Sequence, residues 1–232
     1  TANLDDVRRE ALAHQVMNAL YFSSMEWGKV AAPEWVRAEL YKGHRIESED
    51  TAALEIGLKG GGKAYFLGTL CAEAGADSTV HIEVVGEKGK ALWKTAGDAA
   101  VTYNDGRTET IADVGRTGRD ELFRNAARMV RGVDKQLNCA LEMTRPFVLT
   151  VNAAFLSSGT TRRTPESIVK PRITDNHECY TDIVGINALV EKGWRERKLY
   201  SDLGAPWAVK TQPFSLNGFT RFEMATPSLD QK

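Results

Sequence analysis

The stretch at residues 58–70, LKGGGKAYFLGTL, decides between two kinds of fold. A phosphate-binding glycine loop needs a strand before it and a helix N-terminus after it, so that backbone N–H groups converge on the anion. Here the segments before and after the glycines, AALEIGL and AYFLGTL, both have strand-like composition. Lys63 is also followed by Ala64, where a P-loop requires Ser or Thr. We therefore predict a hairpin turn at glycines 60–62. No other segment is predicted to have the strand–glycine–helix order, so the chain should not form a dinucleotide-binding fold by itself.

Composition is typical of a globular domain and excludes several classes of protein. The chain has 232 residues, 42% of them hydrophobic, and 30 basic against 31 acidic residues. This balance argues against a nucleic-acid-binding protein, and the absence of long apolar runs argues against a membrane protein. The three cysteines are widely spaced, which indicates reduced thiols and a cytoplasmic location. We expect no metal site, because the histidines and cysteines lack ligand spacing. Thr1 fits either a trimmed initiator methionine or a chain cut from something longer.

Strand patterns surround the glycines. From about Ala38 to Ile111 the sequence predicts one meander of antiparallel strands, with further hairpin turns at residues 86–89 (GEKG) and 104–106 (NDG). Val80, Ile82 and Val84 should share one face of their strand, with His81 and Glu83 on the other.

Helix patterns flank this region. We predict helices at residues 5–28, 118–132, 144–159 and 178–204, the last being the longest. Thr144 would cap the third helix, Pro146 would lie in its first turn and Gly159 would follow its end. Residues 206–232 should form loop or a late strand, with residues 220–232 partly disordered. The fold expected for residues 1–232 is a single α+β domain: a large, predominantly antiparallel open sheet with helices packed on one face.

Five segments, taken in order, resemble a known family. They are REALAHQVMNALYFS (9–23), RAELYKGHRIESEDTAALEI (37–56), VHIEVVGEKGKALW (80–93), LEMTRPFVLTVNAAFLSSG (141–159) and LYSDLGAPWAVKT (199–211). Together they resemble the C-terminal domain of the Gfo/Idh/MocA oxidoreductases, the group of glucose–fructose oxidoreductase and inositol dehydrogenase. The resemblance implies an NAD- or NADP-binding Rossmann domain that precedes this chain and a sugar, cyclitol or related alcohol as substrate. It also implies that this chain alone is inactive.

The same resemblance implies a proton-transfer histidine on the first helix. His14 occupies this place, with Glu10 one helical turn before it. Oxidation of an alcohol removes a proton as hydride leaves, and a histidine beside a carboxylate suits that role. Many members carry an aspartate three residues after the histidine, where this chain has Met17 and, one place further on, Asn18. The alternative is a structural histidine next to a surface glutamate.

Four further residues are candidates for substrate binding: Asn18, His44, Arg45 and His177. Each has a simpler alternative. His44 and Arg45 fit a solvated loop between strands, and His177 fits a helix cap with Asp175 and Asn176. The chain as a whole has an alternative too, as a non-catalytic ligand-binding or scaffold module.

The open face of the sheet is expected to pair with a second copy of the chain. The side chains predicted for that face are Tyr65, Leu67, His81 and Glu83. Such a mixture of apolar and polar groups fits a subunit interface better than free solvent, so the resemblance and the pattern both favour a homo-oligomer.

Overall fold

The structure is a computed structural model and describes residues 13–222, apart from residues 25, 27, 77–79, 95–96, 114–117 and 176. The described chain divides into two compact units. The first contains residues 32–74 and 148–222, and the second contains residues 13–31 and 75–147. The α+β class is confirmed, since both units contain helices and antiparallel strands.

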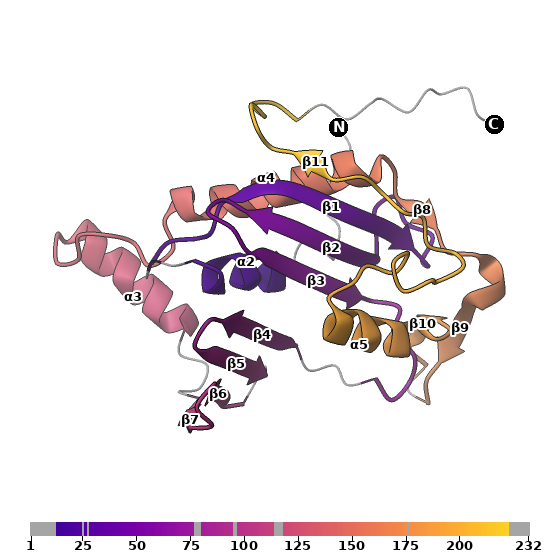
Figure 1. The fold of residues 1–232 in the computed structure, drawn as a ribbon, viewed down its shortest axis with the longest axis horizontal. Helices are drawn as coiled ribbons and strands as arrows, with labels where there is room; N and C mark the ends of the chain where they lie inside the picture. Colours follow the sequence, from indigo (N-terminus) through magenta and orange to yellow (C-terminus); the bar gives the residue numbers. More distant parts are fainter. Residues whose placement is uncertain are drawn as a thin grey trace. The chain divides into compact units, whose positions relative to one another are not determined.

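The first unit is built on a five-stranded sheet. Its strands are β1 (Pro33–Lys42), β2 (Thr51–Leu58), β3 (Lys63–Thr69), β8 (Arg162–Arg163) and β11 (Phe214–Ser215). The order is β11-β1-β2-β3, with β8 paired in parallel to the end of β1 (Figure 1). The glycines at 60–62 join β2 to β3 with φ angles of 89°, 97° and 85°. The predicted glycine hairpin is therefore confirmed, and only glycine adopts these angles without strain.

Side chains of this sheet alternate between two different faces. One face carries Val36, Ala38 and Leu40 of β1, opposite apolar residues of β2. The other face carries Arg37 opposite Glu55, and Glu39 beside them on β1. All eight residues of β2 are buried, so this central strand is covered on both faces.

The polar face is covered by the chain itself. Tyr200 and Trp207, in the segment at residues 199–211, pack against Tyr41 of β1, with ring centroids 4.8 Å apart for Tyr41 and Trp207. Tyr65 and Leu67 pack against the same cluster. The expectation that these two side chains lie on an open face is wrong, because the C-terminal segment and α5 occupy that place.

The outer edge of β1 is occupied along its length. β11 pairs with Trp35 and Val36, and β8 pairs with Tyr41 and Lys42. Between these two short strands, hydroxyls from the end of helix α4 (Leu141–Ser158) accept the backbone N–H groups of β1. Ser157 Oγ accepts the backbone N–H of Ala38 at 3.0 Å, and Ser158 Oγ accepts that of Leu40 at 3.3 Å.

Helix α4 begins one turn earlier than predicted. Thr144 lies inside it and donates its hydroxyl to the carbonyl of Leu141 at 2.7 Å, so it does not cap the helix. Pro146 is also inside the helix, while Gly159 follows the last turn with a φ of 71°, as predicted.

The predicted long helix at residues 178–204 is wrong over its first part and over residues 197–204, and α4 is longer than the helix that remains. Its residues form β10 (Cys179–Ile183), which pairs with β9 (Val169–Ile173), and then α5 (Ile186–Glu196). A short 3-10 helix, Glu166–Ile168, precedes β9. Gly185, with a φ of 81°, separates β10 from α5, which gives one strand–glycine–helix order that the sequence did not predict.

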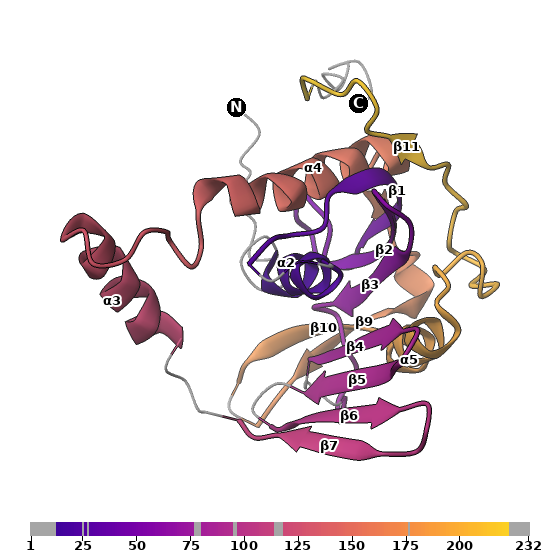
Figure 2. The same cartoon turned by 60° about the vertical axis from the view of Figure 1, so that its left-hand side comes forward.

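The second unit contains a separate four-stranded sheet. Its strands are β4 (His81–Gly86), β5 (Gly89–Lys94), β6 (Ala99–Tyr103) and β7 (Thr108–Ile111), in the order β4-β5-β6-β7 (Figure 2). Both predicted hairpins are confirmed, but the single meander at residues 38–111 is wrong, because it divides into two sheets between Thr69 and His81.

Two helices belong to the second unit, α2 (Ala13–Phe22) and α3 (Gly118–Val130). Val16 and Leu20 of α2 are buried, as their spacing predicts. Three large apolar side chains of α3 are exposed: Leu122, Phe123 and Val130, the last of them 90% accessible. Within the described residues, no helix is both long enough and apolar enough to span a bilayer.

Candidate functional site

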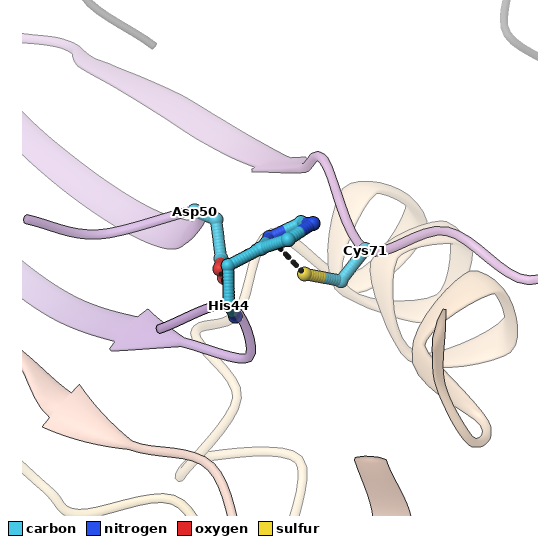
Figure 3. Close-up of side chains that lie close together, drawn as sticks. All are labelled: His44, Asp50 and Cys71. Carbon is cyan, nitrogen blue, oxygen red and sulfur yellow. Dashed lines mark hydrogen bonds and ion pairs between the residues drawn. The ribbon is translucent and has the colours of Figure 1, made fainter. Parts of the chain in front are cut away.

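Three chemically reactive side chains meet at one edge of the five-stranded sheet. His44 follows β1, Asp50 precedes β2 and Cys71 follows β3 (Figure 3). Because neighbouring strands are antiparallel, these three strand ends lie at the same edge. We refer to His44, Asp50 and Cys71 as the edge cluster.

Asp50 organises the loop that carries His44. Its carboxylate accepts the backbone N–H groups of Gly43 and His44 at 2.8 to 2.9 Å and the hydroxyl of Thr51 at 3.0 Å. The side chain is completely buried. Burial alone would raise the pKa of Asp50, but these backbone donors, together with the side chains of His44 and Cys71, hold it below its usual value.

Cys71 is also completely buried and lies against the same imidazole. Its Sγ is 3.3 Å from His44 Nδ1, and that nitrogen is 2.9 Å from the Asp50 carboxylate. The backbone N–H of Cys71 is fixed by Thr69 Oγ1 at 3.0 Å, and Thr69 Oγ1 lies 2.8 Å from Thr51 Oγ1. Gly43 leaves room for the thiol, since a Cβ at that position would lie 3.0 Å from Sγ.

The geometry limits what the edge cluster can do chemically. In a nucleophilic triad, the acid and the nucleophile contact opposite nitrogens of the imidazole. Here both contact Nδ1, and the outer ring nitrogen of His44 points away from both (Figure 3). The arrangement therefore does not suit a thiol nucleophile. An imidazole, a thiol and a carboxylate that converge on one point are, in contrast, ligands that a metal ion can share.

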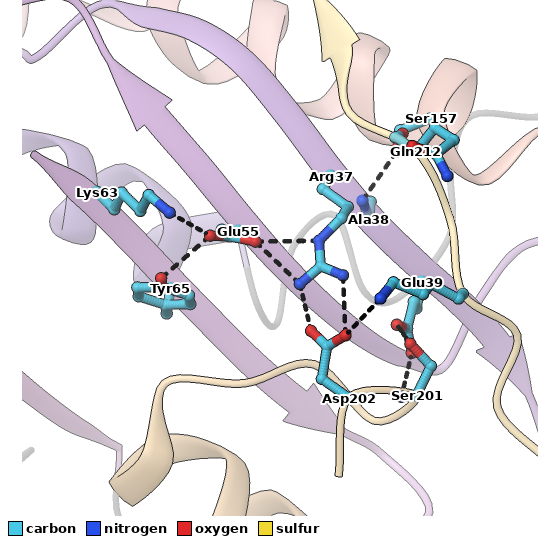
Figure 4. A network of polar contacts seen from close by, with 11 residues as sticks. Arg37, Ala38, Glu39, Glu55, Lys63, Tyr65, Ser157, Ser201, Asp202 and Gln212 are labelled. Atoms are coloured by element: carbon cyan, nitrogen blue, oxygen red, sulfur yellow. Dashed lines mark hydrogen bonds and ion pairs between the residues drawn. The ribbon is translucent and has the colours of Figure 1, made fainter. Parts of the chain in front are cut away.

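A second polar network fixes the C-terminal segment to the sheet (Figure 4). The guanidinium of Arg37 lies between Glu55 and Asp202, while Lys63 and Tyr65 donate to the other oxygen of Glu55 at 2.8 and 3.1 Å. The hydrogen bond with Arg37 lowers the pKa of Asp202. Burial would raise the pKa of Glu55, but Lys63, Arg37 and Tyr65 lower it.

Glu39 is the fully buried acid beside this network. It accepts the backbone N–H of Ser201 at 3.1 Å and the Ser201 hydroxyl at 2.5 Å. Burial raises the pKa of Glu39 in spite of these two donors. The contacts of Arg37 with Asp202 and of Glu39 with Ser201 both connect the sheet to residues 199–211, so their role is structural.

The predicted proton-transfer pair is only partly described. His14 lies on α2 with an exposed side chain, and Asn18 lies one turn further along with a half-buried one. Glu10 lies outside the described residues, so the spacing of Glu10 and His14 stays a prediction.

The other predicted residues lie in loops. Arg45 is exposed in the loop after β1. His177 lies in the turn between β9 and β10 with a φ of 62°, and its Nδ1 is 3.1 Å from the carbonyl of Asp175. The predicted helix cap at this point is wrong, because a hairpin and not a helix follows.

Of the predicted site residues that the structure describes, His44 is the one found in a cluster, together with two residues that the sequence analysis did not propose as site residues. Asp50 and Cys71 are 21 residues apart in the sequence, so spacing gives no sign of the contact. The signal that could have found them is position, since each lies directly next to a predicted strand.

Comparison with solved structures relates this fold to oxidoreductases. A protein from Desulfitobacterium hafniense, described as an NADPH-dependent oxidoreductase, is 12% identical and aligns with a TM-score of 0.51 over 65% of this chain and 45% of its own. The WlbA dehydrogenase from Bordetella pertussis, solved with NADH and UDP-GlcNAcA, is 17% identical, with a TM-score of 0.47 over 64% of this chain and 41% of its own. UDP-N-acetylglucosamine 3-dehydrogenase GnnA from Acidithiobacillus ferrooxidans is 12% identical, with a TM-score of 0.47 over 56% and 41%.

These likenesses concern the fold alone. The chain aligns with less than half of the length of each of these three structures. No family model matches the chain, and no curated protein matches it in sequence.

Proposed function

We propose that this chain is the C-terminal, substrate-binding domain of an NAD- or NADP-dependent oxidoreductase that acts on a sugar, cyclitol or related alcohol. The observation that carries the proposal is the ordered series of five Gfo/Idh/MocA-like segments on an α+β fold. The fold likeness to the D. hafniense oxidoreductase supports it. The nucleotide would be bound by a Rossmann domain outside this sequence.

His14 is the proposed proton-transfer residue. A proton must leave the substrate hydroxyl as hydride passes to the nicotinamide, and histidine exchanges protons near neutral pH. His14 is exposed on α2, so its imidazole is accessible to a ligand. Asn18, four residues on, shares its face of the helix, while Glu10 would support it from the preceding turn.

Polar side chains in loops are the proposed substrate contacts. Arg45 and His177 are exposed and can donate hydrogen bonds to hydroxyl or carboxylate groups. In His44, Nδ1 is held by Asp50, which leaves the outer ring nitrogen for a substrate.

The test uses the protein as it occurs in its source, with any sequence that precedes Thr1. Reduction of NAD⁺ or NADP⁺ is followed by absorbance with a panel of sugars, sugar nucleotides and cyclitols. His14→Ala should lower kcat by about 10²- to 10⁴-fold and leave the Kd for the cofactor nearly unchanged. Gln15→Ala, which changes the adjacent residue on α2, is the matched control and should retain activity.

Each outcome separates the two functions considered. Turnover that depends on His14 supports the dehydrogenase. Substrate binding without turnover, in a protein that binds no nicotinamide cofactor, would instead favour the non-catalytic ligand-binding or scaffold module.

We further propose that copies of the chain associate. Tyr65 and Leu67 are covered within the chain, so the contact would have to use other surfaces, such as the exposed apolar side chains of α3. Light scattering at high concentration that gave the mass of one chain would contradict this association.

A further inference from the structure

We propose that His44, Asp50 and Cys71 form a zinc-binding site, with the imidazole Nδ1, a carboxylate oxygen and the thiolate as ligands. This inference concerns the first unit alone and does not depend on the proposed oxidoreductase activity. It rests on the positions of the donor atoms, their burial and their charge.

The donor atoms are already close to the spacing of a zinc site. All three lie within 4.8 Å of one another. Tetrahedral zinc with ordinary bond lengths places nitrogen and sulfur ligands about 3.6 Å apart, and nitrogen and oxygen ligands about 3.4 Å apart. The corresponding distances here are 3.3 Å from Nδ1 to Cys71 Sγ and 2.9 Å from Nδ1 to Asp50 Oδ2. These two pairs therefore differ from the zinc values by about half an ångström or less, and the third pair, Cys71 Sγ and the carboxylate oxygen, lies within 4.8 Å and would close to about 3.6 Å around the ion.

The charge of the edge cluster favours a divalent cation. Asp50 is fully buried, and the ion-pair partner that the described residues give it is His44, which is charged only when protonated. The hydrogen-bond donors around Asp50 favour its ionised form and leave its negative charge in place, and a bound cation would neutralise that charge. Zn²⁺ with one carboxylate and one thiolate is neutral. On binding, Cys71 releases its thiol proton to solvent, and the single proton of the neutral imidazole moves by exchange with solvent from Nδ1, where it faces Asp50, to the outer nitrogen.

The surroundings of the ligands resemble the outer shell of a metal site. Backbone N–H groups of Gly43 and His44 and the hydroxyl of Thr51 hold the carboxylate, and Thr69 holds the backbone of Cys71. Such outer contacts orient ligands before the ion arrives. The His44 side chain is 35% exposed, and we expect the ion to enter past this ring and to take water as its fourth ligand. A sulfur ligand selects zinc over magnesium or calcium.

The test is direct metal binding to the full chain. The protein is stripped with a chelator, equilibrated with Zn²⁺ and dialysed, and its zinc content is measured by mass spectrometry. We expect about one equivalent per chain. Cobalt(II) used in place of zinc should give the near-ultraviolet absorption of a cobalt–thiolate bond.

Matched variants assign the ligands. Cys71→Ser and His44→Gln should each weaken zinc binding at least about tenfold, and Cys71→Ser should also abolish the cobalt–thiolate band. Cys139→Ser and His177→Gln change the same residue types at exposed positions and should have no effect. Circular dichroism checks that each variant is folded.

Two results would overturn the proposal. One is wild-type protein that retains substantially less than one equivalent of zinc, which needs no variant to interpret. The other is a folded Cys71→Ser protein that binds zinc as tightly as the wild type, since the ion would then lie elsewhere.

Discussion

Substitution of methionine for Arg37 removes the cation that lies between two largely buried carboxylates. The side chain of Arg37 is 12% exposed, and those of Glu55 and Asp202 are 11% and 20% exposed. Methionine keeps most of the volume and the apolar stem, so the change removes charge and hydrogen bonds with little loss of packing.

The expected cost follows from the contacts that are lost. Arg37 Nε donates to Glu55 at 3.0 Å, Nη1 donates to Asp202 at 3.2 Å, and Nη2 pairs with both acids. Removal of one partner from a buried ion pair typically costs about 3–5 kcal/mol, but here Lys63 and Tyr65 still hold Glu55, and Lys210 Nζ lies 3.8 Å from Asp202. We expect the free energy of unfolding to fall by about 2–4 kcal/mol at pH 7.

The cost should depend on pH. The folded-state pKa values of Asp202 and Glu55 are both lowered, so their stabilising contribution is present above the unfolded values near 4 and is lost as pH falls through the lower folded values. The difference between wild type and Arg37→Met should therefore shrink below about pH 4. Urea titrations followed by circular dichroism at several pH values measure it.

Lys63→Met is the matched control. Lys63 contacts the same Glu55 at 2.8 Å, but its side chain is 50% exposed, and an ion pair of this kind contributes about 0–1 kcal/mol. If Arg37→Met cost no more than Lys63→Met at pH 7, or if its cost did not change with pH, the role assigned to the Arg37 contacts would be wrong.

Two further substitutions test other parts of the first unit. In Gly57→Ala, the new Cβ would lie 2.1 Å from the Trp35 indole, so we expect a loss of at least about 2 kcal/mol in urea titrations, whereas Gly86→Ala meets open space and should change stability by less than about 0.5 kcal/mol. Equal effects would contradict the close approach of Trp35. Burial raises the pKa of Glu39, so ionisation destabilises the fold as pH rises above the unfolded value near 4.3. Glu39→Gln cannot ionise at this position, so its free energy of unfolding relative to wild type should rise with pH. If the free energies of unfolding of the two proteins ran parallel between about pH 4 and 8, the destabilising ionisation of Glu39 would be excluded.

Local chemistry explains which elements the sequence predicts. The turns at residues 60–62, 86–89 and 104–106 depend on glycines with special backbone angles, and all three are hairpins in the structure. The division into two sheets depends on which strands pair, which local patterns do not specify. The helix predicted across Cys179–Ile183 failed for a related reason, because this short segment of mixed polarity does not distinguish helix from strand until its partner β9 is known.

The edge cluster was missed because its members are distant in sequence. Motif spacing detects ligands that share one helix or one turn, whereas His44, Asp50 and Cys71 come from three strand ends. The antiparallel order of β1, β2 and β3 was correctly predicted. From that order alone, residues just outside the strands at one edge could have been expected to meet, although their distances and burial could not.

The occupied outer edge of β1 protects this strand from pairing with strands of other molecules during aggregation. An unpaired strand edge can accept strands from other molecules and so start fibril growth. Along β1 this is blocked by β11, by the Ser157 and Ser158 hydroxyls and by β8 in turn. In the sheet of the second unit, the terminal strand β7 has four exposed residues, with Glu109 between two threonines. A strand this short that carries a charge is a poor template for pairing with another molecule. Ser157→Val would remove an acceptor from the β1 edge and leave the buried N–H of Ala38 without the hydrogen bond that Ser157 gives it.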